Sequence, residues 1–82
     1  MRIDKFLKVS RIIKRRSVAK ELTDKGRALI NDRVAKGGST VKVGDVITLH
    51  IGSKDLVFRV NELKETTKKD EALGMYEVIG ED

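Results

Sequence analysis

The spacing of the apolar residues changes at Gly26, and this change divides the chain into a helical part and an extended part. Before Gly26, apolar residues recur every three to four positions, which is the period of amphipathic helices. After Gly26, short apolar runs are separated by turn residues, a pattern typical of strands. Because 82 residues are enough for one compact domain and too few for two, these helices and strands should share a single core.

Two short helices are expected before Gly26. The first has Asp4 in its first turn, bends or ends near Ile12, and carries a buried stripe of Ile3, Phe6, Leu7, Ser10 and Ile13. Its opposite side would display Lys5, Lys8 and Arg11 to solvent. The second helix covers about residues 16–25, with Val18, Ala19 and Leu22 on one face, a Glu21–Lys25 pair, and Gly26 as a left-handed C-terminal cap.

Two arginines stand at the start of the second expected helix. Arg15 and Arg16 lie where the helix dipole disfavours cations, by about 0.3–1 kcal/mol each. The conflict disappears if an anion binds there, because free backbone N–H groups, the Ser17 hydroxyl and two guanidinium groups could converge on one phosphate. The pattern therefore favours a phosphate-binding site at this helix end.

The strands are expected in pairs joined by short turns. Residues 27–30 and 33–36 flank the turn pair Asn31-Asp32, Gly44-Asp45 marks a further turn, and residues 46–51 and 55–60 flank Gly52-Ser53. Between these pairs, residues 37–39 should form a loose connection. A short helical turn at residues 67–73, ended by Gly74, should precede a last strand at residues 76–79.

The charges are distributed unevenly along the chain. Through Lys36, twelve basic residues face four acidic ones, a net charge of +8. From residue 37 onward, six basic residues face nine acidic ones, a net charge of −3. This asymmetry indicates a protein that presents one basic surface to a polyanion. Arg is well suited to that task, because its guanidinium group binds phosphate through two parallel hydrogen bonds.

Several classes of protein fit the sequence poorly. Without Cys, and with His50 as the one histidine, the chain has no convincing metal site, cofactor site, disulfide or nucleophilic triad. We therefore expect a protein that is not an enzyme and carries neither metal nor cofactor. The short apolar runs predict no membrane association, and the absence of a convincing base-reading helix argues against DNA as the partner.

The ordered residues resemble a known family. The residues 2–7 (Arg-Ile-Asp-Lys-Phe-Leu), the basic run from Arg11 to Arg16, Ala19 with Leu22, Gly26 and the turn at Asn31 are similar to the RNA-binding domain named after the fourth protein of the small ribosomal subunit. The similarity is greatest to stand-alone members of that family from low-GC Gram-positive bacteria, and extends to heat-shock protein fifteen. One difference is Asp32, where the family usually carries Gly.

The resemblance implies both a fold and a role. The fold would be α+β, with two N-terminal helices packed on a small, twisted, mainly antiparallel sheet. Residues 1–82 would form one domain, with the family motif at residues 1–50 and an extension from about residue 61. The role would be in ribosome-associated quality control in the cytoplasm, on obstructed large ribosomal subunits. The implied partners are rRNA, peptidyl-tRNA and an RqcH-type alanine-tailing factor, and the protein should be monomeric off the ribosome.

The resemblance and the charge pattern together give a set of candidate RNA-binding residues. These are Arg2, Lys5, Lys8, Arg11, Lys14, Arg15, Arg16 and Ser17, with Asp4 as a cap and an ion-pair partner that orients the arginines. Arg16 is the strongest candidate, since it falls on the arginine at the entry of the family's second helix. Acidic residues 62–71 should face away from RNA and limit non-specific binding. The alternative is a general structured-RNA-binding protein or an accessory protein of ribosome recycling or assembly.

Overall fold

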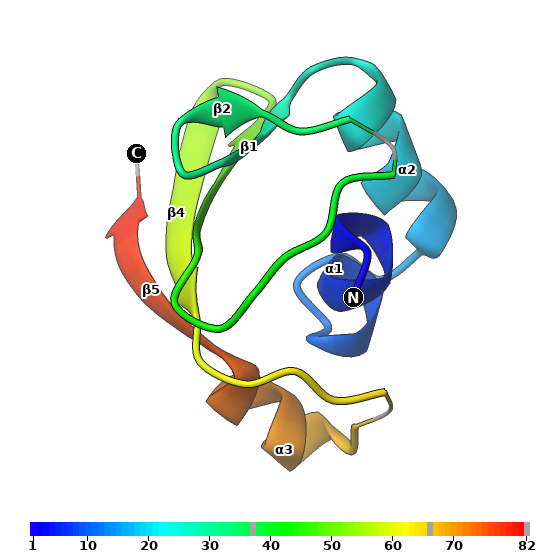
Figure 1. The fold of residues 1–82 in the computed structure, drawn as a ribbon, viewed down its shortest axis with the longest axis vertical. Helices are drawn as coiled ribbons and strands as arrows, with labels where there is room; N and C mark the ends of the chain where they lie inside the picture. The colour runs from blue at the N-terminus through cyan, green and yellow to red at the C-terminus, as the bar shows by residue number, and fades with distance from the viewer. Residues whose placement is uncertain (37, 66, 82) are drawn as a thin grey trace.

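The computed structural model describes residues 1–36, 38–65 and 67–81, and within them it shows an α+β fold (Figure 1). Two N-terminal helices, α1 (Ile3–Val9) and α2 (Arg16–Asp24), pack against each other on one side of a sheet. The sheet has the order β2-β1-β3-β4-β5, and each neighbouring pair is antiparallel. The expected fold class is therefore confirmed.

Helix α1 ends earlier than its apolar stripe predicts. Ile3, Phe6 and Leu7 are fully buried as expected, but the helix stops at Val9 rather than near Ile12. The buried Ser10 hydroxyl donates to the Leu7 carbonyl at 3.3 Å, and Arg11 then adopts a left-handed conformation with φ 63°. A left-handed residue directly after the last turn ends a helix. Arg11 consequently lies on the connection to α2, and the expectation that it projects from α1 was wrong.

Helix α2 has the predicted limits but a different buried face. It ends at Asp24, and Gly26 takes the left-handed conformation with φ 69° that the sequence predicts. Ala19 and Thr23 are its buried residues, whereas Val18 is 40% exposed. Thr23 can be buried because its hydroxyl donates to the Lys20 carbonyl at 2.7 Å. Of the predicted apolar face, Ala19 is therefore confirmed and Leu22 is half-buried, whereas the prediction for Val18 was wrong.

The first hairpin joins β1 (Ala28–Ile30) to β2 (Arg33–Val34). Asn31 and Asp32 both have positive φ values, 51° and 67°, which is the pattern of a tight type I′ turn. The Asn31 side chain anchors this turn, because its oxygen accepts the Val46 N–H at 2.9 Å and its amide donates to Asp45 at 3.0 Å. The turn forms as predicted, although β2 is two residues shorter than expected.

The second hairpin, β3 (Val46–Ile51) and β4 (Lys54–Val60), supplies the sheet's half of the core. Ile47, Leu49 and Phe58 are fully buried, and the Phe58 ring stacks on Phe6 of α1 with centroids 6.3 Å apart. Alternate residues along β4, such as Arg59, point to the opposite, exposed face. The helices therefore cover one face of the sheet.

The C-terminal part consists of α3 (Lys69–Ala72), a 3₁₀ turn η1 (Leu73–Met75) and β5 (Tyr76–Glu81). Gly74 lies inside the 3₁₀ turn, so the expectation that it ends the helical segment was wrong. Strand β5 runs two residues further than predicted, because it pairs with β4 as far as Glu81. Figure 1 shows α3 at the end of the molecule where β5 begins.

Candidate nucleic-acid interface

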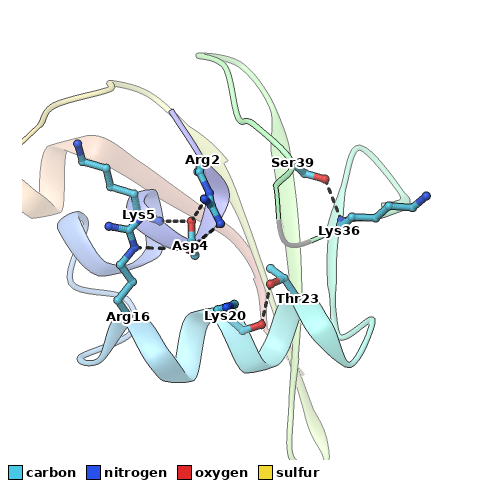
Figure 2. Close-up of polar contacts among 8 residues, drawn as sticks. All are labelled: Arg2, Asp4, Lys5, Arg16, Lys20, Thr23, Lys36 and Ser39. Atoms are coloured by element: carbon cyan, nitrogen blue, oxygen red, sulfur yellow. Dashed lines mark hydrogen bonds and ion pairs between the residues drawn. The ribbon is translucent and has the colours of Figure 1, made fainter.

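A buried carboxylate joins the two N-terminal segments that carry the strongest candidate residues. Asp4 has a side chain only 4% exposed, and its oxygens lie 3.3 Å from Arg2 Nε and 3.4 Å from Arg16 Nε (Figure 2). Asp4 also accepts the backbone N–H of Lys5 at 2.9 Å. We call Arg2, Asp4 and Arg16 the arginine clamp. Its burial is tolerated because both sides of the carboxylate receive charged or backbone donors.

The backbone around the clamp explains why the fold brings these residues together. Arg2 forms a bridge with Thr40, and the neighbouring Ile3 N–H donates to the Ser39 carbonyl at 2.9 Å. The chain end is thus fixed before α1 begins, while Arg16 is fixed as the first residue of α2. Both arginine side chains remain about half exposed, at 50% and 51%. The buried Asp4 carboxylate therefore holds two guanidinium groups at the surface.

The other two candidates at the start of α2 lie close to the clamp. Arg15 is the extended residue before the helix, and Ser17 is in its first turn; both are exposed. Neither the phosphate-binding geometry nor the Ser17 contact is tested by these positions, and both stay predictions. One anion does lie near Arg16, namely the carboxylate of Asp4. This carboxylate offsets part of the unfavourable interaction between Arg16 and the helix dipole.

The acidic segment, defined as residues 62–71, lies against α1 rather than away from it. Lys5 forms an ion pair with Glu65, and Arg11 donates to the Thr67 carbonyl at 3.1 Å. The Thr67 hydroxyl in turn donates to the Val9 carbonyl at 2.6 Å. Hydrogen bonding and charge from Lys5 lower the pKa of Glu65. Three contacts thus join this segment to α1 and the connection after it, so it does not lie apart from the basic half. That it faces away from RNA stays a prediction.

The remaining candidates gather at a second place on the surface. Lys8, Arg11 and Lys14 line a groove whose other wall is α3, and Lys69 of α3 joins them. The sequence does not single out Lys69, because it lies more than fifty positions away and its closeness depends on where α3 packs. The candidate residues thus form two groups, the arginine clamp and the cations of this groove.

Other chemistries find little support in the part of the chain that the structure describes. None of its helices is long and apolar enough to cross a membrane. It brings together no group of three His, Cys, Asp or Glu side chains that could hold a metal ion. His50 contacts Asp55 across the β3–β4 hairpin at 2.5 Å. Phe6 and Phe58 are core residues, so neither can stack on a base.

Comparisons with known proteins show the family of this chain. Residues 1–47 match the model of the S4 domain. The chain is 56% identical to the RQC P-site tRNA stabilizing factor of Bacillus subtilis (strain 168), covering all of this chain and 95% of that protein. It is 54% identical to the protein of the same name from Streptococcus pneumoniae, covering 99% of this chain and 92% of that one.

A solved structure has the same fold. Heat Shock Protein 15 of Vibrio cholerae superposes with a TM-score of 0.87 at 28% identity, over 96% of this chain and 81% of that one. The match reaches beyond the S4 region to the C-terminal elements. Taken with the sequence relatives, it confirms the resemblance drawn from the N-terminal residues. The chain belongs to the S4-domain family and, within it, to the group of RQC P-site tRNA stabilizing factors.

Proposed function

We propose that this protein stabilises tRNA in the P site of large ribosomal subunits during ribosome-associated quality control. Support comes from relatives that carry this role in their names and match the chain over its whole length at 54–56% identity. An S4 domain is an RNA-binding module, and the basic N-terminal part supplies the positive surface that such a module needs. The protein acts by binding RNA, and no chemical step is required of it.

The arginine clamp is the single observation that carries this proposal furthest. Arg2 and Arg16 are held about half exposed by one buried carboxylate, so little side-chain entropy is left to lose when they bind phosphate. Guanidinium groups recognise phosphate oxygens through paired, charge-assisted hydrogen bonds. Contacts of this kind recognise the backbone and shape of structured RNA rather than its sequence.

We also propose where the protein works and which molecules it binds. The protein would work in the cytoplasm on obstructed large subunits, contacting both rRNA and peptidyl-tRNA through the clamp, Lys5, Arg15 and Ser17. By holding the peptidyl-tRNA it would assist an RqcH-type factor that adds alanine to the stalled chain. Off the ribosome it would be a monomer. Each of these finer statements rests on the family resemblance and needs its own test.

The first experiment compares wild type with Arg16→Ala for binding to purified large subunits that carry peptidyl-tRNA. Co-sedimentation gives the affinity, and circular dichroism checks the fold. Loss of a charge-assisted contact of roughly 1.5–3 kcal/mol should weaken binding by about 10- to 150-fold. The matched control is Arg59→Ala, because Arg59 is also a partly exposed arginine but lies on the sheet face that the helices do not cover.

The outcomes separate the possible errors. A folded Arg16→Ala variant that stays off the particles, with Arg59→Ala still bound, supports the role and locates the contact. Equal binding of Arg16→Ala and wild type would show that the clamp is not the RNA contact. Wild type that binds structured RNA but not the loaded subunits would replace the proposal with a general RNA-binding or ribosome-recycling accessory role.

A further inference from the structure

A groove of about 440 Å³ lies between the connection that follows α1 and the short helix α3. Four cations line it: Lys8, Arg11, Lys14 and Lys69. The apolar part of its lining consists of Ile13, Ala72, Leu73 and Tyr76. We call it the α3 groove. Its volume falls within the range of about 300–1,000 Å³ that small-molecule sites in proteins occupy.

The apolar lining is unusual for a surface that remains in water. Leu73 is 69% exposed, which makes it the most exposed large apolar side chain in the described part of the chain. Beside it, Tyr76 is only half-buried, and its ring is held by an edge contact with Phe58 at a centroid distance of 5.7 Å. The groove thus offers an apolar surface with a fixed aromatic ring, and a partner that covers Leu73 would remove apolar area from water.

The cationic lining shows what kind of partner fits. All four charged side chains of the groove are positive, and they come from both walls. Arg11 is held there by a left-handed backbone, an uncommon conformation for a residue with a side chain, and donates to the Thr67 carbonyl. Such conformations concentrate at functional sites. A partner of this groove should carry negative charge beside a flat apolar group.

We propose that the α3 groove binds an unpaired nucleotide of the RNA that the chain holds. The base lies against Leu73, Ile13 and Tyr76, and the phosphates on either side of it contact the cations. An unpaired nucleotide combines a flat apolar face with adjacent negative charge, which is the pattern that the groove presents. This proposal rests on the proposed RNA-binding function and adds a site for single-stranded RNA to it.

The place of the groove cations in the sequence favours a nucleotide over an acidic peptide. Lys8, Arg11 and Lys14 of the groove belong to the same basic stretch of the sequence as Arg16 of the arginine clamp, so the groove continues the part of the chain that is proposed to bind RNA. The walls also combine two parts of the chain. Lys69, Leu73 and Tyr76 lie outside residues 1–47, the region that matches the S4 model, so the groove is not part of that domain alone.

The test uses two RNA hairpins that share one stem, of which one is blunt and the other ends in a two-nucleotide single-stranded 3′ overhang. Wild type should bind the overhang hairpin about 5- to 150-fold more tightly, the gain expected from stacking one base. Leu73→Ser should strongly reduce this preference and leave the affinity for the blunt hairpin unchanged. The control is Ile79→Ser, because Ile79 is also exposed, at 47%, but lies on β5 outside the groove.

Each outcome decides the proposal. A strongly reduced overhang preference in Leu73→Ser alone, with thermal unfolding unchanged, supports it. Equal preference in wild type and Leu73→Ser, or an equal loss on both hairpins, overturns it. If a leucine-containing acidic peptide binds wild type but not Leu73→Ser while RNA binding is unaffected, the groove belongs to a protein partner. If wild type binds neither hairpin nor loaded subunits, the proposed function fails first.

Discussion

Asp32 has the backbone conformation that glycine adopts at the second position of a tight hairpin turn. Its φ of 67° follows Asn31 at 51°, so both central residues of the β1–β2 turn are left-handed. Asn tolerates this conformation well, and here the Asn31 side chain anchors the turn by accepting the Val46 N–H. Asp32 has the same left-handed backbone conformation, and its side chain is exposed. The stability of this turn should therefore depend on the residue at position 32.

We predict that Asp32→Gly raises the free energy of unfolding by about 0.5–1 kcal/mol, because glycine removes the steric cost of a positive φ. Asp32→Ala is the matched control, because it removes the same carboxylate but keeps a Cβ. It should not raise the free energy of unfolding. Urea unfolding followed by circular dichroism measures both. Equal effects of Gly and Ala would show that the carboxylate, not the backbone, determines the change.

Asp4 is the residue on which the arginine clamp depends. Asp4→Asn keeps an oxygen for the Lys5 N–H but removes the charge that Arg2 and Arg16 share. We expect the free energy of unfolding to fall by roughly 1–2 kcal/mol, since the arginines can still be hydrated. RNA affinity should fall as well, because both guanidinium groups lose their fixed orientation.

The readout that separates these effects is affinity under conditions where each variant is fully folded. Asp55→Asn is the control, because Asp55 pairs with His50 across the β3–β4 hairpin and should leave RNA binding unchanged. If Asp4→Asn binds RNA as wild type does, Asp4 is only structural. At this scale the sequence predicts the Asp4 partnership, because the family motif places the residues, but not the Lys5–Glu65 pair, whose members are sixty positions apart.

At the scale of elements, the acidic segment acts as a strap across α1. Glu65 forms an ion pair with Lys5, and Thr67 contacts both Arg11 and Val9, so the strap covers part of the basic surface. Lys5 lowers the pKa of Glu65 through a hydrogen bond and its charge. A carboxyl with a lowered pKa keeps its contact above its ordinary pKa and loses it as the pH falls through the lowered one. The contact is therefore complete at neutral pH.

We predict that Glu65→Gln increases affinity for unrelated RNA at neutral pH, by up to about fivefold, because Lys5 is released. Glu62→Gln is the matched control: it makes the same charge change in the same segment, but Glu62 contacts Lys64 rather than α1. Filter binding to a random RNA pool measures both. Identical increases would mean that net charge alone is responsible, and no increase from either would mean that the strap does not restrict binding.

The elements differ in how well the sequence predicts them. The β3–β4 hairpin is predicted to within one residue, because apolar alternation and the turn at Gly52 both act locally. The end of α1 is missed by about three residues, because it depends on the left-handed Arg11, which no propensity indicates. The helical turn predicted at residues 67–73 is found as α3 and the start of η1, but the packing of the strap and α3 was not predicted. They follow from tertiary contacts with α1, which a local pattern does not contain.

Over the whole molecule, the division of the sequence into a +8 part and a −3 part does not become two separate faces. The acidic strap returns to α1, while Lys69 extends the positive surface onto α3. The resulting basic surface combines two kinds of contact. The arginine clamp offers charge alone, whereas the α3 groove offers charge with an apolar surface. These two contributions should respond differently to salt.

The dependence of RNA affinity on salt concentration should separate the two contributions. Binding of the overhang hairpin should weaken linearly on a plot of log affinity against log salt concentration, because each phosphate contact releases counterions. Arg16→Ala removes one phosphate contact and should reduce the slope by about 0.7–1. Leu73→Ser removes apolar contact without changing charge, so it should lower the affinity at every salt concentration and leave the slope unchanged. If Leu73→Ser changes neither the affinity nor the slope, the groove contributes through its cations alone. An unchanged slope for Arg16→Ala would mean that the clamp touches no phosphate.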